Sequence, residues 1–238
     1  MADPLAQAKH DLAIANRIVS VEGIIDAFGH VSMRHPTKPD RYLISRSRSP
    51  ELVSPDDLME FGLDGEVVDK ADKRQPYLER FIHGEIYRKR PDVQSVVHSH
   101  APSVVPFTSS SIRLRPICHM GSFLRNGVSV FEIRDRFKAT DMLVTNPDQG
   151  AALADVLATD TVVLMRGHGF CSVGQTIPIA VFRAVYTQNN AELQSRTIAL
   201  GGEVTYLADD EAALSEATNR AVVERPWGLW KARFAPQA

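Results

Sequence analysis

Apolar residues recur every three to four positions in four stretches of the chain, which is the spacing of helices with one buried face. The second stretch is expected to open at Pro76, because proline suits the first turn of a helix, and to bury Leu78 on its apolar side. The predicted helices cover residues 3–22, 76–89, 147–158 and about 176–200.

Short apolar runs lie between these helices and predict β-strands. Leu63, Asp64 and Gly65 separate two of the runs, a combination typical of a hairpin turn. Because short strands alternate with helices, the order of elements predicts an α/β or α+β fold with a mixed or antiparallel sheet. The predicted strands cover residues 29–34, 41–45, 58–61, 66–68, 93–99 and 161–165.

The chain contains 238 residues, enough to bury a full core without disulfide or metal staples. Because no linker-like stretch divides it, we expect one domain over residues 1–238, with a helical extension from about residue 209 that carries Trp227 and Trp230. The formal net charge of −2 excludes a strong electrostatic attraction to nucleic acid or to anionic membranes.

Cys118 and Cys171 are the only cysteines, so a disulfide framework is not expected and a reducing compartment is favoured. The first residues lack the apolar segment of a signal peptide, and no apolar run approaches the ~18 residues that span a bilayer. These features predict a cytoplasmic globular protein with no membrane or nucleic-acid partner.

Two histidines, His98 and His100, stand at the end of a predicted strand. Side chains two residues apart point to the same face of a strand, so the two imidazoles can converge on one ion. His168 lies between two glycines directly after another predicted strand and can supply a third ligand. Three protein ligands on a divalent ion leave a position open for substrate.

Glu79 and His83 are four residues apart in the second predicted helix, so they would share one face. Taken alone, this spacing is typical of a pair on a helix surface. Beside three histidines, the carboxylate of Glu79 is a candidate fourth ligand or a candidate acid and base.

Five short motifs together resemble those of the class II aldolase and adducin family. Their order and spacing agree over roughly residues 8–205. The resemblance implies a three-layer α/β/α fold whose central sheet is mixed, largely antiparallel and flanked by helices. The motifs are Gly29-His30-Val31-Ser32, Glu79 with His83, Arg90-Pro91-Asp92-Val93, Val97-His98-Ser99-His100 and Arg166-Gly167-His168-Gly169.

The resemblance also implies the composition of the site. In the family three histidines hold one divalent ion per subunit, which implies His98, His100 and His168 as ligands and Glu79 as the acid and base. The resemblance suggests Zn²⁺ or Mn²⁺, and three histidines also suit Fe²⁺ or Co²⁺. It further implies a homotetramer with active sites between subunits, which would give the two C-terminal tryptophans a surface on which to bury.

The chain departs from the family's sugar-phosphate aldolases where those enzymes hold a phosphate. Tyr77 and Leu78 replace a pair of serines, and His30 replaces an asparagine. The segment Arg46-Ser47-Arg48-Ser49-Pro50 replaces a stretch of proline, serine and glycine, and His119 stands in the region of an assisting tyrosine. These changes resemble the family's decarboxylase branch, which acts on hydroxylated aromatic or heteroaromatic carboxylates.

We therefore expect a carbon–carbon lyase, a metal-dependent decarboxylase of a hydroxylated aromatic or heteroaromatic (di)carboxylate in a catabolic pathway. Arg46 and Arg48 lie two residues apart and can form a fork for a second carboxylate, because arginine binds carboxylates through paired hydrogen bonds. A solvated loop is the alternative interpretation of this pair. Ser47 and Tyr77 complete the expected substrate-binding set.

Decarboxylation and retro-aldol cleavage leave the same kind of enolate-like species, which a metal ion stabilises. Glu79, His30 or His119 would supply the proton that replaces CO₂. Three alternatives stay open: a sugar-phosphate or hydroxyacid aldolase, a sugar-phosphate epimerase and a non-enzymatic scaffold like the adducin head. The missing serine pair counts against the first two, and the three histidines count against the third.

Overall fold

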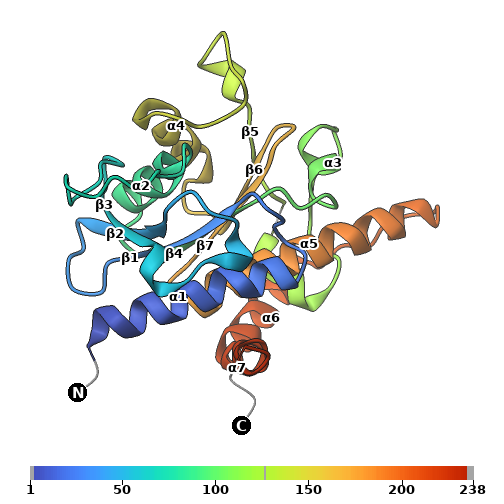
Figure 1. Cartoon of the computed structure of the whole chain (residues 1–238). Coiled ribbons are helices and arrows are strands. Elements are labelled where there is room, and N and C mark those ends of the chain that lie inside the picture. Colours follow the sequence, from blue (N-terminus) through green and yellow to red (C-terminus); the bar gives the residue numbers. More distant parts are fainter. Residues whose placement is uncertain (1–2, 126, 235–238) are drawn as a thin grey trace.

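The chain folds around a seven-stranded sheet, which lies in the middle of Figure 1. The computed structural model describes residues 3–125 and 127–234, and the elements named below lie in those ranges. The strand order is β3-β2-β1-β4-β7-β6-β5. Neighbouring strands are antiparallel except β5 and β6, which are parallel. The strands are β1 His30–Arg34, β2 Arg41–Ser45, β3 Leu58–Gly62, β4 Ser95–Ser99, β5 Val130–Phe131, β6 Val162–Met165 and β7 Gly169–Gly174.

Helices cover both faces of the sheet, so the predicted three-layer α/β/α fold is confirmed (Figure 1). Helices α1 and α5 pack on one face, and α2 and α4 pack together on the other. Within the two described ranges, none of the helices has the length and apolar character needed to cross a membrane. The helices are α1 Pro4–Val21, α2 Arg80–Lys89, α3 Val105–Thr108, α4 Pro147–Leu157, α5 Ile177–Ala199, α6 Asp209–Ala221 and α7 Glu224–Ala232.

Local sequence signals explain where three long helices begin. The side chains of Asp3, Asn146 and Thr176 accept hydrogen bonds from backbone N–H groups in the first turns of α1, α4 and α5. These bonds satisfy donors that a helix N-terminus leaves unpaired. A proline also stands in the first turn of each helix, where its fixed φ favours the helical conformation.

The register of the central strands brings the candidate residues to one end of the sheet. His30 of β1 stands opposite His98 of β4, and His98 stands opposite Cys171 of β7. His100 follows the end of β4, and His168 lies in the tight turn between β6 and β7. A shift of the register by one residue would turn each side chain of the shifted strand to the other face.

The helix predicted to begin at Pro76 is wrong at that end. Pro76 instead forms a β-bridge with the segment that follows β2, and α2 begins at Arg80, with Glu79 at the position before it. Leu78 is 58% exposed rather than buried. Because the chain around Pro76 pairs with another segment, the helix starts later, and Glu79 does not share a helical face with His83.

The hairpin expected after β3 forms only in part. Residues 66–68 make one isolated bridge to β3, between Phe61 and Val67. Two further backbone hydrogen bonds, of 2.9 and 3.0 Å, join the two segments. This pairing is too short to define a strand, so β3 is left as one edge of the sheet.

The C-terminal tryptophans are buried within their own chain. Trp227 and Trp230 are 6% and 4% exposed, and they belong to the apolar cluster that includes α1 and α5. The expectation that they need a neighbouring subunit for burial is therefore wrong. The two tryptophans therefore leave no apolar surface of their own for a second subunit to cover.

Gly169 permits the close approach of β7 to the end of β4. A Cβ atom at this position would lie 2.0 Å from the carbonyl oxygen of Ser99. We expect Gly169→Ala to lower the free energy of unfolding by about 1–3 kcal/mol, the usual cost of overpacking, as measured by urea unfolding. Gly228→Ala is the matched control, because nothing lies within 4 Å of its added Cβ. Equal stability of Gly169→Ala and the unchanged protein would contradict this account.

Candidate metal centre and the adjoining cavity

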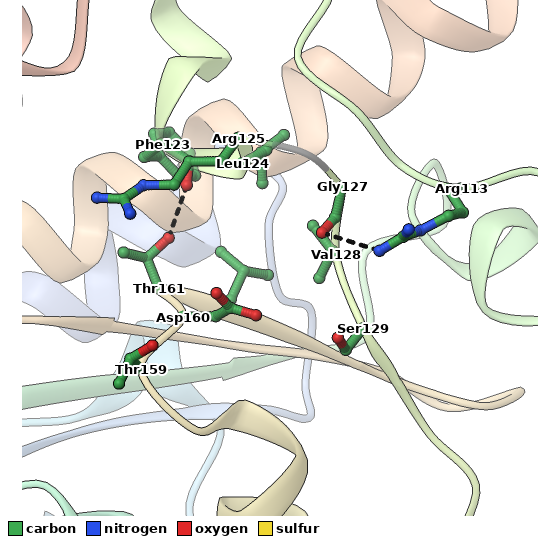
Figure 2. A pocket seen from close by; sticks show the side chains of 11 residues that line it. Arg113, Phe123, Leu124, Arg125, Gly127, Val128, Ser129, Thr159, Asp160 and Thr161 are labelled. Atoms are coloured by element: carbon green, nitrogen blue, oxygen red, sulfur yellow. Dashed lines mark hydrogen bonds between the residues drawn. The ribbon is translucent and has the colours of Figure 1, made fainter. Parts of the chain in front are cut away.

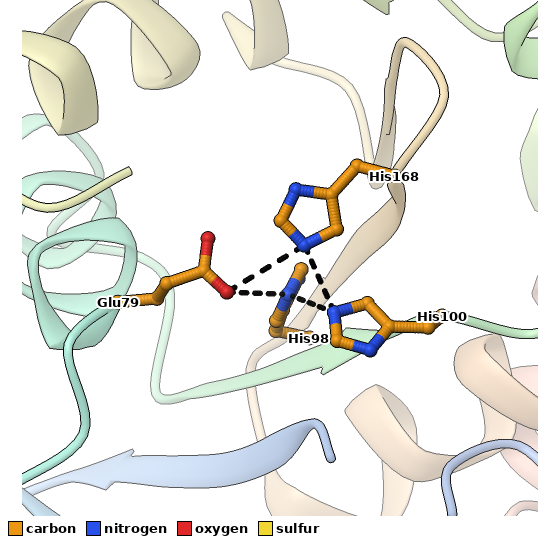
Figure 3. Close-up of side chains that lie close together, drawn as sticks. All are labelled: Glu79, His98, His100 and His168. Carbon is orange, nitrogen blue, oxygen red and sulfur yellow. Dashed lines mark hydrogen bonds and ion pairs between the residues drawn. The ribbon is translucent and has the colours of Figure 1, made fainter. Parts of the chain in front are cut away.

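Four side chains that could hold a metal ion meet at this end of the sheet (Figure 3). One ligand atom from each of Glu79, His98, His100 and His168 lies within 4.8 Å of the others. The Nε2 atom of His100 is 3.0 Å from Nε2 of His98 and 2.9 Å from Nε2 of His168. The Oε2 atom of Glu79 lies 3.4 and 3.5 Å from the Nε2 atoms of His98 and His168. The structure thus brings together the three predicted ligands and the predicted acid–base residue.

The orientation of these rings suits an ion. Nδ1 of His168 lies 3.0 Å from the carbonyl oxygen of Met142. Because a carbonyl only accepts, Nδ1 of the neutral ring carries the proton and Nε2 offers a lone pair. Three facing nitrogens cannot all be satisfied by one another, whereas a divalent cation satisfies them together. Three imidazoles and a carboxylate suit Zn²⁺, Mn²⁺, Fe²⁺ or Co²⁺.

Burial and mutual contact set the charges in the cluster. Burial lowers the pKa of His100 to about 3, together with the neighbouring His98 and His168. Burial alone would raise the pKa of Glu79, but His98 and His168 outweigh it and hold this pKa well below 4.5. Burial acts to lower the pKa of His168, and Glu79 raises it above 6.5. Glu79 is therefore ionised at neutral pH, the form in which a carboxylate binds divalent ions.

The cluster opens onto a cavity of about 440 Å³, a size typical of small-molecule sites. Glu79 and His100 form part of its wall, so a bound ion and a bound substrate would be neighbours. Four predicted catalytic or substrate-binding residues, and several mainly apolar ones, complete the wall. These are His30, Ser47, Arg48 and Tyr77, with Ala27, Phe28, Gly29, Ser49, Leu78 and Leu143.

The predicted arginine fork is not free, because both guanidinium groups contact Asp57. Arg46 Nε donates to Asp57 Oδ1 at 2.6 Å, and Arg48 Nη1 donates to the same oxygen at 3.3 Å. Burial acts to raise the pKa of Asp57, but Ser54 and the two arginines lower it to about 2. Among the described residues that line the cavity, Arg48 is present and Arg46 is not. The pair therefore does not form the expected two-armed fork.

His119 lies apart from the cavity within this chain. It is an exposed residue at the start of the short 3-10 helix η3, His119–Leu124. Its carbonyl oxygen accepts a hydrogen bond from Asn219 of α6 at 2.8 Å. A catalytic role for His119 would therefore require a contact that a single subunit does not make.

No sequence motif predicts two of the contacts made by the cluster. The backbone N–H of Val144 donates to Glu79 Oε1 at 3.1 Å, and the carbonyl of Met142 contacts His168. The segment before α4 thus orients two members of the cluster through its backbone. Backbone groups are the same in every residue type, so the sequence carries no signal for these contacts.

A second cavity, of about 310 Å³, lies elsewhere on the chain (Figure 2). On its wall, Arg113 donates to the carbonyl oxygen of Gly127 at 3.4 Å, and Thr161 donates to the carbonyl oxygen of Phe123 at 3.0 Å. None of the described residues that line it is a histidine or a glutamate. The cavity beside the histidine cluster is therefore the candidate site.

Comparisons with known proteins agree with this geometry. The Class II Aldolase and Adducin N-terminal domain matches residues 10–195. "Decarboxylase tropJ" of Talaromyces stipitatus is 40% identical, over 87% of this chain and 86% of that protein. A 3,4-dihydroxyphthalate decarboxylase of Arthrobacter keyseri is 29% identical over the same shares. The crystal structure of an aldolase II superfamily protein from Pseudomonas syringae has a TM-score of 0.80 at 19% identity, covering 98% of this chain and 94% of that one.

The fold, the histidine cluster and the decarboxylase relatives define the class of the protein as a carbon–carbon lyase. More narrowly, the chain belongs to the class II aldolase and adducin family. The resemblance carried by the five motifs is thereby confirmed. The resemblance to the family's decarboxylase branch is also confirmed, because decarboxylases are among the relatives.

Replacing two of the clustered histidines should remove the ion. We expect His98→Ala/His100→Ala to lower the metal content of purified, dialysed protein at least about tenfold, because two of four donors are lost. Mass spectrometry of the bound metal measures this. His10→Ala is the control, since it removes an exposed histidine of α1. Undiminished, stoichiometric metal in the double variant would show that these residues are not the ligands.

Proposed function

We propose that the protein is a metal-dependent decarboxylase of a hydroxylated aromatic or heteroaromatic dicarboxylate in a catabolic pathway. The observation that carries the proposal is that one cavity is lined by Arg48 and by two members of the four-donor cluster, Glu79 and His100. Its relatives include a decarboxylase and a 3,4-dihydroxyphthalate decarboxylase, which supports the reaction and the substrate class.

Arg48 would bind the carboxylate that stays on the ring. Its Nε is buried and has no hydrogen-bond partner among the described residues. Two guanidinium groups face one carboxylate at Asp57, so this group of three side chains keeps one positive charge. The rings of His30 and Tyr77, whose centroids are 4.6 Å apart, would contact the substrate ring.

His98, His100 and His168 would hold one divalent ion per subunit, Mn²⁺ or Zn²⁺, with Glu79 as a further ligand or close neighbour. When bound, such an ion is a Lewis acid that stabilises negative charge on a substrate oxygen. The lowered pKa of His100 and the ionised carboxylate of Glu79 support this assignment.

Glu79 would move the proton. The ionised carboxylate can take the proton of the substrate hydroxyl and return it to the ring carbon that bears the leaving carboxylate. The carbon–carbon bond then breaks, its electron pair passes into the ring and CO₂ leaves. The hydroxyl oxygen finally regains a proton from water. His30 and His119 are the alternative proton donors.

We further propose a homotetramer in which a neighbouring subunit closes each site. Phe28 and Leu78 line the cavity, yet they are 69% and 58% exposed. Exposed apolar side chains around a pocket are typical of a surface that another molecule covers. In such an assembly His119 of one subunit could reach the site of another.

A substrate panel separates decarboxylase from aldolase. The unchanged protein should release CO₂ from 3,4-dihydroxyphthalate or from a hydroxypyridine dicarboxylate, and should not cleave fuculose 1-phosphate. We expect Arg48→Ala to lower kcat/KM for the dicarboxylate about 30-fold or more, since losing a charged hydrogen bond to a bound carboxylate costs ~2 kcal/mol or more. For a monocarboxylate that lacks the second acid group, kcat/KM should start low and Arg48→Ala should lower it little further.

Arg41→Ala is the control for this series, because Arg41 pairs with Glu60 at 2.7 Å and does not line the cavity. Its kcat/KM should match that of the unchanged protein. Efficient cleavage of a sugar phosphate, or dicarboxylate turnover that Arg48→Ala does not change, would contradict the decarboxylase proposal and favour the aldolase alternative.

Glu79→Gln keeps the size of the side chain but removes its capacity to carry a proton. We expect kcat to fall at least ~10²-fold, the lower range for general acid–base catalysis, while KM changes much less. The metal content of the variant must be measured alongside, because glutamine is also a weaker ligand. Normal turnover would move the proton transfer to His30 or His119.

A further inference from the structure

A row of buried polar side chains runs inward from His30, the histidine on the cavity wall. His83 Nε2 lies 2.7 Å from His30 Nδ1, and His83 Nδ1 lies 2.5 Å from the hydroxyl of Ser32. The Ser32 hydroxyl in turn lies 2.7 Å from the phenol oxygen of Tyr87. All four residues are at most 3% exposed, so water does not replace these contacts.

Tyr87 sets the direction in which this row donates. Burial raises the pKa of its phenol, so the group keeps its proton and needs an acceptor. Its one hydrogen bond within the described residues is the 2.7 Å contact with the hydroxyl oxygen of Ser32. Among the described residues, the Ser32 hydroxyl is then the acceptor left for the phenol proton.

The directions of the remaining hydrogen bonds in the row follow from the one that Tyr87 donates to Ser32. Ser32 accepts from Tyr87, and within the described residues His83 Nδ1 is the remaining partner for its own hydroxyl proton, so Ser32 donates to His83. His83 then carries its proton on Nε2 and donates to His30 Nδ1. The opposite direction would begin with a proton on His30 Nδ1 and would leave the buried phenol proton without an acceptor, which is costly inside a protein.

We infer that Tyr87, Ser32 and His83 hold His30 as the tautomer with its proton on Nε2, so that His30 donates a hydrogen bond to an anionic oxygen of the substrate. Within the described residues, Nε2 of His30 has no hydrogen-bond partner, and its ring lines the cavity. The identity of the oxygen rests on the proposed function: a carboxylate or the oxygen of the ring hydroxyl.

This arrangement gives His30 a different task from the one expected of it. A ring that accepts at Nδ1 and donates at Nε2 is neutral and orients a substrate oxygen without giving up its proton. Glu79, one of the four side chains of the cluster, is left to move the proton. Tyr87, Ser32 and His83 are positioning residues, because they act through His30 and do not line the cavity.

Neutron diffraction from crystals of the deuterated, zinc-loaded protein tests the tautomer directly. We expect deuterium on Nε2 of both His30 and His83, and none on Nδ1 of His30. Deuterium on His30 Nδ1, alone or on both nitrogens, would overturn the inference. This experiment does not depend on activity, so a protein that fails to decarboxylate leaves it decisive.

Two variants of His83 test the consequence for turnover. His83→Leu removes the donor to His30, and we expect kcat to fall about 10- to 100-fold with KM changed less than about threefold. His83→Gln supplies an amide N–H that can donate to His30 Nδ1, so it should recover most of this loss. Equal losses in both variants, or normal turnover of His83→Leu, would contradict the positioning role.

Tyr87→Phe removes the group that sets the direction and should lower kcat about three- to tenfold. Tyr42→Phe is the matched control. Tyr42 is as buried as Tyr87, but its hydroxyl donates to the carbonyl oxygen of Arg80 at 2.9 Å, outside the row. Equal effects of the two substitutions on kcat would mean that only packing was lost.

Discussion

The pairing of β4 with β1 on one side and with β7 on the other is the constraint on which the site depends. The three strands place His30, His98 and Cys171 side by side across the sheet. Because His100 follows directly after β4, two ligands are fixed by one strand. Gly169 lets β7 come close enough for the preceding turn to add the third, His168.

The fixed strand pairing holds the three histidine rings close together although their facing nitrogens do not attract one another. Three imidazole nitrogens that face one another are not attractive partners, so their approach must be enforced by the strands and the apolar layers around them. Glu79 is the compensating charge, and the cap position before α2 sets it beside the rings. The chain around Pro76 forms a β-bridge with the segment after β2 and is therefore not helical. Glu79 thus lies at the cap position of α2 instead of inside a longer helix.

The sequence was a good guide to elements with strong periodicity and to the metal ligands. Residues two apart in a strand share a face, so the spacing of His98 and His100 predicts that their side chains converge. Thr176 as N-cap and Pro178 in the first turn mark the start of α5. Contacts made across the fold could not be predicted. Nothing in the sequence shows that Asp57 pairs with Arg48, or that His83 contacts His30. Such contacts depend on how loops and layers pack, which residue spacing does not encode.

Under the proposed function the cavity would offer an anion two separate attractions, Arg48 and the ion that the histidine cluster would hold. Their fixed positions would favour one kind of substrate. Arg48 is held by Asp57, and the histidine cluster is held by the sheet. A planar ring with two acidic groups could meet both without losing internal freedom, whereas a flexible sugar phosphate would lose several rotations. The aromatic wall of His30 and Tyr77 adds contact area only for a flat molecule. A donor hydrogen bond from His30 would then orient the ring within this space, so selectivity and positioning would arise from the same few side chains.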